Sequence, residues 1–290
     1  MSATEPPVEL TPRLLREWEL PTPGSSKYER GRVVVVGGAA GTPGAVQLAG
    51  LAALRVGGGH LTLAVAQPVA AALAVATPEA GVVGLAADAA GSLRGDDLED
   101  LLADRLGKAD AVVVGPGLDT PDSAERVVGA LLPLLGDRTR LVVDAFALGA
   151  LAAKGLPAAL AGRTVLTPND GEAELLLGRP LDDDVAADVA GIAAGQSAVT
   201  ACHDVVATPG GQTWRLGLGH PGLATSGSGD VLAGAVGGLL ARGAEPAQAA
   251  AWAKYLHGAA GERLAARIGR MGFLAREILE ELPLVLAELG

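Results

Sequence analysis

The segment 222–234 has the residue types of a phosphate-binding turn. Glycines 227 and 229 alternate with serines and lead into an apolar, alanine-rich stretch. Glycine lets a backbone approach a phosphate closely, and the first N–H groups of a helix have no partner within it. Asp230 would then lie at the mouth of an anion site as a candidate general base. The alternative is a turn in which Asp230 only stabilises the first helical turn, and spacing alone does not separate the two.

Further candidate residues follow strand-like segments. Ligands bind at the carboxyl ends of the strands in parallel α/β sheets, so residues at strand ends are expected to share one crevice. Each also has a structural interpretation: Gly-Pro-Gly is a common turn, Asp144 is a possible helix cap, and Asn169 or Asp170 is a possible N-cap. The candidates are the loops 37–38, 41–45 and 115–117, Asp144, and the loop 167–172.

Alternating elements must position these residues. Short β-branched runs alternate with alanine- and leucine-rich stretches, which predicts an α/β fold with a mostly parallel sheet and helices on both faces. The hairpin 205–216 is expected at the sheet edge. One domain is expected over 27–290, after a loosely attached N-terminal extension, 1–26. The predicted strands are 33–36, 61–65, 111–114, 141–144 and 164–167, and the predicted helices are 45–56, 96–106, 123–135, 172–177, 230–241, 246–266 and 275–289.

Composition excludes several classes of protein. The chain has 290 residues, 49% of them hydrophobic, and a formal net charge of -11, which argues against nucleic acid or an anionic membrane as a partner. No segment reads as a membrane span or a signal peptide. Cys202 is the only cysteine, so an intrachain disulfide is impossible and a reducing, cytoplasmic location is expected.

With these elements in this order, the chain resembles the ADP- or ATP-dependent NAD(P)H-hydrate dehydratases of the ribokinase-like superfamily. The Leu-Thr-Pro and Gly-Glu motifs, followed later in the chain by Ser-Gly-Asp, are specific to that family. A lone Gly-x-Gly-Asp would indicate only the superfamily. The resemblance implies a three-layer ribokinase-like fold. It rests on segments 27–33, 37–38, 43–45, 53–59, 78–79, 114–118, 143–145, 166–168, 171–172, 224–230 and 255–259.

The resemblance implies a cofactor repair reaction. The S-epimer of hydrated NADH or NADPH is returned to NAD(P)H, and ADP or ATP supplies the driving force. Asp230 would act as the base, while the N–H groups from Gly227 to Gly229 would stabilise the transferring phosphoryl group. Mg²⁺ is expected to bridge the phosphates, bound mainly by water and phosphate oxygens, and no protein metal ligand is predicted.

Binding residues and partners are carried over in the same way. The hydrated dinucleotide would contact Ala45, Gly117, Asn169 and Asp230. The resemblance also implies a homotetramer and a separate epimerase as pathway partner. The nucleotide would contact Thr200, Ala201, Cys202, His203, Asp204, Ser228 and Gly229.

Some residues depart from the family pattern. Asn169 and Asp170 stand where His-Pro is usual, and Thr200 stands where the family has a lysine that offsets phosphate charge. Phe146 and His220 also differ from the usual residues. Weaker or altered nucleotide binding is therefore expected. Two alternative functions remain open. A small-molecule kinase of the same superfamily would share the Gly-Ser-Gly-Asp chemistry, and the changes at Thr200 and Asp170 would suit a dinucleotide-binding protein with little or no catalysis.

Overall fold

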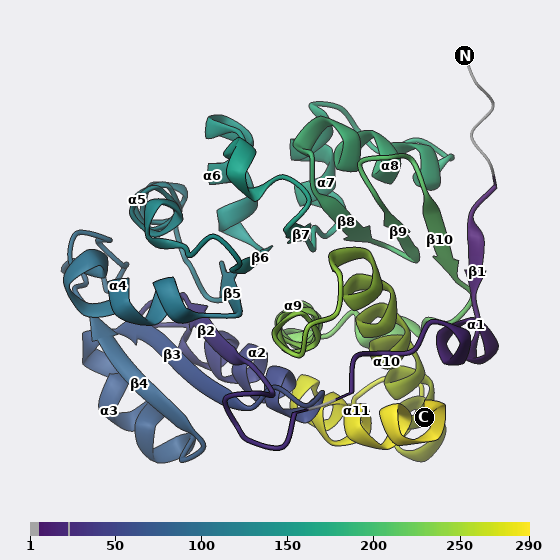
Figure 1. The fold of residues 1–290 in the computed structure, drawn as a ribbon, viewed down its shortest axis with the longest axis horizontal. Helices are drawn as coiled ribbons and strands as arrows, with labels where there is room; N and C mark the ends of the chain where they lie inside the picture. The colour runs from purple at the N-terminus through teal and green to yellow at the C-terminus, as the bar shows by residue number, and fades with distance from the viewer. Residues whose placement is uncertain (1–5, 23) are drawn as a thin grey trace.

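A computed structural model describes residues 6–22 and 24–290. A ten-stranded sheet lies between two layers of helices, in the order β1-β10-β9-β8-β7-β6-β5-β2-β3-β4 (Figure 1). The seven strands from β4 to β8 are parallel, and β9 is antiparallel to both of its neighbours. The predicted α/β fold with a mostly parallel sheet is confirmed.

The predicted strands are present with small shifts at their ends, and the predicted helices likewise. The strands are β1 (Val8–Leu10), β2 (Arg32–Val36), β3 (His60–Ala66), β4 (Ala80–Leu85), β5 (Ala111–Val114), β6 (Arg140–Val143), β7 (Thr164–Leu166), β8 (Val199–Cys202), β9 (Val205–Ala207) and β10 (Thr213–Leu216). The α-helices are α1 (Pro12–Glu17), α2 (Pro43–Arg55), α3 (Gln67–Ala76), α4 (Leu98–Lys108), α5 (Pro121–Leu131), α6 (Phe146–Lys154), α7 (Asp170–Leu177), α8 (Val185–Gln196), α9 (Ser228–Ala241), α10 (Pro246–Arg267) and α11 (Ala275–Leu289).

Each face of the sheet carries its own core. Successive side chains of a strand point to opposite faces, so Val33 and Val35 join one cluster while Val34 and Val36 join the other. Helices α2, α9, α10 and α11 cover the first face, and α4 to α8 cover the second. Because both faces are buried, the central strands are continuous β-branched runs.

Small residues let α9 pack closely on α2. A Cβ on Gly234 would lie 2.0 Å from the Ala49 carbonyl oxygen, and one on Gly238 would lie 2.4 Å from that of Ala53. No side chain fits at these two positions. The two backbones therefore hold each other in place, and α9 is fixed with its first turn at the carboxyl ends of the strands.

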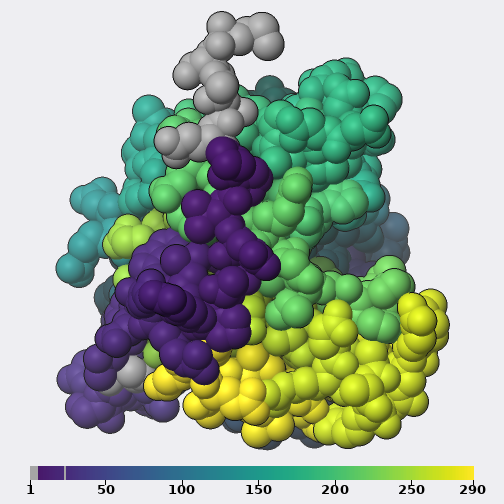
Figure 2. All heavy atoms as spheres, turned by 90° about the vertical axis from the view of Figure 1, so that its right-hand side faces the viewer, coloured from purple at the N-terminus to yellow at the C-terminus, as the bar shows by residue number. Residues whose placement is uncertain are grey.

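The N-terminal segment is tied to the sheet, so the expectation of a loose attachment is wrong for its described part. Strand β1 pairs in parallel with β10, so the β9–β10 hairpin is not the sheet edge. The rings of Trp18 and Trp214 stack with centroids 5.3 Å apart, and Trp252 Nε1 donates to the Trp18 carbonyl at 3.0 Å. Figure 2 shows this segment lying along the molecule's side against later parts of the chain.

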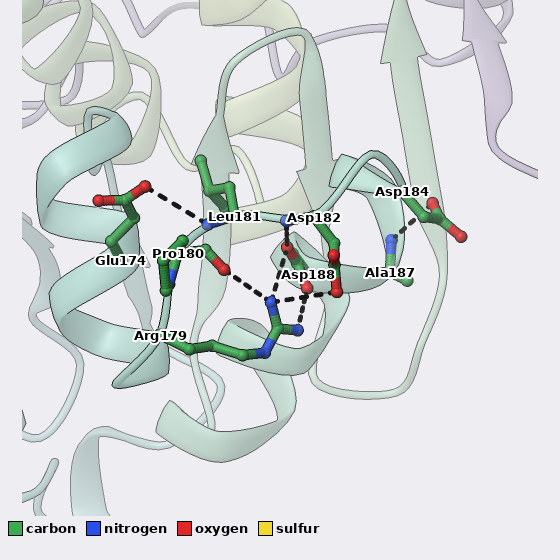
Figure 3. Close-up of polar contacts among 8 residues, drawn as sticks. All are labelled: Glu174, Arg179, Pro180, Leu181, Asp182, Asp184, Ala187 and Asp188. Atoms are coloured by element: carbon green, nitrogen blue, oxygen red, sulfur yellow. Dashed lines mark hydrogen bonds and ion pairs between the residues drawn. The ribbon is translucent and has the colours of Figure 1, made fainter.

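A buried carboxylate organises the connection between α7 and α8. Asp188 accepts hydrogen bonds from the Arg179 guanidinium and, at 2.7 Å, from the Asp182 N–H (Figure 3). The bond from Arg179 holds the pKa of Asp188 below its usual range, although burial opposes this. The connection is thus fixed at the end of α7 opposite to its candidate site residues.

Candidate functional site

The first turn of α9 has the geometry of an anion site. Gly227 is the N-cap with φ of +89°, a conformation that favours glycine. Within the described chain, the N–H groups of Gly229 and Asp230 are not paired with any acceptor, and the Gly227 carbonyl accepts from the Val231 N–H at 3.2 Å. A Cβ on Gly229 would meet nothing within 4 Å. The loop therefore presents free N–H groups, and the positive end of the helix dipole, to open space.

Asp230 is the third residue of this helix and is partly buried. Burial raises its pKa to about 6 from an ordinary value of 3.8. A carboxylate with this pKa is mostly ionised at neutral pH and is a better proton acceptor than an exposed aspartate. Asp230 thus has both the position and the basicity of a general base.

A second buried carboxyl group lies near Asp230. Asp144, which is 6% exposed, follows β6 and accepts a hydrogen bond from the Thr167 hydroxyl at 2.8 Å. Burial raises the pKa of Asp144 to about 7, although the Thr167 bond opposes this, and the charges of Glu172 and Asp230 raise it further. The ends of β6 and β7 therefore face the start of α9, as the strand-end rule predicts.

Two predicted substrate-binding residues, Ala45 and Gly117, are neighbours. The Gly117 carbonyl accepts from the Ala39 N–H at 2.8 Å and from the Thr42 hydroxyl at 2.7 Å. Gly117 has φ of +69°, and a Cβ on it would lie 3.1 Å from Ala45 Cβ. The loop after β5 and the start of α2 therefore form one continuous wall.

Asn169 serves as the N-cap of α7, which agrees with its structural interpretation. Its side chain accepts from the Glu172 N–H at 3.0 Å, and the Glu172 carboxylate accepts from the Asn169 N–H at 2.9 Å. Asn169 also lines a cavity of about 590 Å³ together with Glu172, Ala145 and Phe146. Capping and ligand contact are compatible here, because the cap uses only part of the amide group.

Asp170 is turned toward the β8–β9 connection. Its Oδ1 lies 2.8 Å from His203 Nε2. The sequence places this carboxylate beside a site for a pyrophosphate, where it would repel the ligand unless it turned away. The contact with His203 gives Asp170 a partner away from the first turn of α9.

The predicted nucleotide segment 200–204 is mostly interior. Thr200 and Cys202 are fully buried within β8 and Ala201 is 1% exposed, so contacts from these three side chains to a nucleotide do not fit the structure. Burial raises the pKa of Cys202 to about 11, which makes its thiol a poor nucleophile. Only His203 and Asp204 reach the surface, and Asp204 lies 3.3 Å from the Arg215 guanidinium.

Sequence reasoning missed the role of His257. Its Nε2 lies 2.9 Å from the Ser228 hydroxyl and 3.1 Å from the Ser228 carbonyl oxygen, so α10 anchors the first residue of α9. Burial, with the nearby Lys254 charge, lowers the pKa of His257 to about 4, and the ring is neutral at physiological pH. The motif 255–259 contains this residue, but spacing along the chain does not indicate its contact with Ser228.

The described residues contain no cluster of three or more His, Cys, Asp and Glu side chains that could hold a metal ion. A divalent ion that arrives on nucleotide phosphates needs no such cluster, because water and phosphate oxygens supply most of its ligands. Among the helices of residues 6–22 and 24–290, none is long and apolar enough to cross a membrane.

The fold and the open helix N-terminus define a ribokinase-like α/β protein with a candidate anion site at the carboxyl edge of its sheet. Residues 33–284 match the family model described as NAD(P)H-hydrate dehydratase, and the chain belongs to this family. It is 42% identical to the ADP-dependent (S)-NAD(P)H-hydrate dehydratase of Xanthomonas campestris, over 97% of this chain and 96% of the other.

Two further relatives extend this comparison. The bifunctional NAD(P)H-hydrate repair enzyme of Moorella thermoacetica is 40% identical over 89% of this chain, which spans only 50% of that protein. The ADP/ATP-dependent NAD(P)H-hydrate dehydratase of Bacillus subtilis, co-crystallized with ATP/Mg²⁺, superposes with a TM-score of 0.81 and 27% identity, over 99% of this chain and 100% of the other. The resemblance proposed from sequence is thus confirmed at the level of family and fold.

Proposed function

We propose that this protein converts the S-epimer of hydrated NADH or NADPH to NAD(P)H, using ADP or ATP. The observation that carries the proposal is that the Asp230 carboxylate lies in the same helical turn as the free N–H groups of Gly229 and Asp230. The relatives' named activities support the substrate and the nucleotide. The phosphate-binding turn and the base lie in one helical turn, as a phosphoryl transfer to a hydroxyl group requires.

The chemistry follows two steps. Asp230 takes the proton of the ring hydroxyl while that oxygen attacks the terminal phosphorus of the nucleotide, and the shortened nucleotide leaves. The free N–H groups of Gly229 and Asp230 stabilise the negative charge on the transferring group, whereas the Ser228 N–H is donated to the Thr225 carbonyl. In the second step the carbon–oxygen bond breaks, phosphate leaves with the electron pair, and the adjacent ring carbon loses a proton to re-form the double bond. Phosphate is a far better leaving group than hydroxide.

The two ligands are assigned to opposite sides of Asp230. The wall formed by Ala45 and Gly117 would contact the hydrated dinucleotide, and so would Asn169. The nucleotide would lie over Ser228 and Gly229, with His203 and Asp204 at the far end and only the backbone of 200–202 within reach. Mg²⁺, when bound with the nucleotide, would offset phosphate charge, and its ligands would be phosphate oxygens and water.

Four further assignments complete the proposal. A homotetramer and a cytoplasmic location are proposed on the family resemblance and on the single, unpaired Cys202. A separate epimerase is proposed as the pathway partner on the family resemblance. The segment 1–26 is proposed as an N-terminal extension of the single domain, and its strand β1 pairs with β10.

The experiment combines pure protein with hydrated NADH, Mg²⁺ and either ADP or ATP, and follows the absorbance of reduced nicotinamide. The expected result is recovery of that absorbance with nucleotide and none without it. Binding of the hydrate without recovery would instead favour a dinucleotide-binding protein. Nucleotide consumption only with a small alcohol such as a hydroxymethylpyrimidine would favour a kinase.

A further inference from the structure

The anion site as described is rich in carboxylates and poor in cations. Asp144, Asp230 and Glu172 all have raised pKa values, for which burial is the main cause. No lysine or arginine among the described residues is a cause of any of these three shifts. A nucleotide bearing several negative charges would need a cation here in addition to backbone N–H groups.

Thr200 cannot supply that charge, and its side chain does not reach the site. It is fully buried between β7 and β9, where its hydroxyl lies 3.5 Å from the Ala198 carbonyl. The lysine that the resemblance implies at this position is thus not replaced by another cation on β8 (Val199–Cys202). A replacement must come from another element.

Helix α10 leads from the amino edge of the sheet to the anion site. At its start, Glu245 pairs with Arg140 at 2.9 Å, and Arg140 is the first residue of β6. Three turns later, His257 contacts Ser228 at the carboxyl edge. Lys254 is three residues before His257 and therefore on the same face of the helix. The stem of Lys254 thus starts one turn below Ser228, within the reach of its four-carbon side chain.

Helix α10 packs against β8, and Lys254 lies near the charged residues that follow β8. Burial lowers the pKa of Lys254, and the Cys202 thiol and the carboxylates of Asp204 and Asp170 oppose that effect. In turn, the Lys254 charge helps to lower the pKa of His257. Lys254 is therefore on a helix that packs against β8 and, one turn further along, contacts the start of α9.

Lys254 is a partly buried cation without a direct partner in the described part of the chain. None of the carboxylates there forms an ion pair with it, and only through-space effects act on its charge. Holding an ammonium group away from water without a counter-ion is unfavourable. An anionic ligand at this place would provide the missing charge.

We propose that Lys254 binds the phosphates of the nucleotide and takes over the task of the lysine that is absent at position 200. This inference rests on the proposed function, because it assumes that the nucleotide lies over Ser228 and Gly229. It assigns to α10 a charge that the family's sequence pattern places on β8.

The experiment measures the affinities of ADP and adenosine for the folded protein by calorimetry, with and without Lys254→Met. Loss of one charge-assisted contact is expected to weaken ADP binding by about 10-fold or more, while adenosine binding stays unchanged. Lys254→Arg keeps the charge and is expected to retain more of the preference for ADP than Lys254→Met. Lys108→Met, at an exposed position on α4, is the matched control and should change neither affinity.

Unchanged ADP affinity in Lys254→Met would overturn the proposal, and so would an equal loss for ADP and adenosine, which would indicate a structural role. If Lys254→Met does not fold, the affinities of Lys254→Arg for ADP and adenosine decide. Because arginine keeps the positive charge, this variant should still bind ADP more tightly than adenosine, and equal affinities would contradict the proposal. Failure of the proposed function has a different signature, since the unchanged protein would then bind no ADP or recover no reduced nicotinamide.

Discussion

The Thr167 hydroxyl donates a hydrogen bond to Asp144 at 2.8 Å, and this bond joins the residues that follow β6 and β7. Even with this donor, burial keeps the pKa of Asp144 near 7, well above its ordinary 3.8. The folded protein therefore holds this proton more tightly than the unfolded chain does. The contribution of Asp144 to stability is fully present below about pH 4 and is lost as the pH rises to about 7.

Asp144→Asn is therefore expected to stabilise the protein at pH 8 and to have little effect at pH 4. The amide resembles the neutral acid and carries no charge to bury, so a gain of roughly 2–4 kcal/mol is expected at pH 8. Urea unfolding at the two pH values measures it. Asp100→Asn, at an exposed position on α4, should change stability little at either pH, and a loss of stability for Asp144→Asn at pH 8 would contradict the prediction.

Asp230→Asn is expected to lower the turnover of hydrated NADH by about 10²-fold or more, because the amide cannot accept the hydroxyl proton. Nucleotide affinity should be nearly unchanged, since the N–H groups of the turn remain. Steady-state kinetics and ADP titration measure the two effects. Asp100→Asn, at an exposed first-turn acid on α4, is the control. Equal turnover in both variants would reduce Asp230 to a helix-stabilising residue.

The pH dependence follows from the raised pKa of Asp230. The base works only when ionised, so kcat/KM is expected to rise with pH, with a midpoint near 6, and to level off above it. In the residual activity of Asp230→Asn, the fall of kcat/KM at low pH should be absent. A midpoint near 4 in the unchanged enzyme would mean that burial does not tune this carboxylate.

Alanine substitutions at two glycines of α9 are expected to change different properties, namely ADP affinity at Gly229 and thermal stability at Gly234. At Gly229 the added methyl group has open space around it, so the protein should remain folded while the methyl group blocks close approach of a phosphate. ADP binding should weaken by about 10-fold. At Gly234 the methyl group would meet the Ala49 backbone at 2.0 Å, so the melting temperature should fall instead. Calorimetry and thermal unfolding separate the two cases.

The central part of the fold could be predicted because its signals are local. The valine runs of β2 and β5 are buried on both faces, and such strands have no polar residues to obscure their ends. Strand β1 was not predicted, since three residues have too little pattern and depend on β10, about 200 residues later, for pairing. Helices α3 and α8 were not predicted either, because alanine-rich segments show little amphipathic contrast.

The positions of Asp144, Asn169 and Asp230 were predictable, because a strand end or a helix start determines each of them. It was not predictable where a contact crosses between elements. The alignment placed Thr200 in a binding loop, but strand pairing with β7 and β9 buries its side chain. The contact of His257 with Ser228 depends on the packing of α10 against α9, and no spacing along the chain reports on it.

All three tryptophans of the chain, Trp18, Trp214 and Trp252, belong to one cluster at the β1 edge of the sheet. Indole fluorescence from this protein therefore originates from a single place, where the N-terminal segment docks. Undocking of that segment would change the emission before the rest of the domain unfolds. Ligands bound at the start of α9 would leave the emission largely unaltered. Tryptophan fluorescence therefore reports on the docking of the N-terminal segment at the sheet edge and not on the occupancy of the candidate site.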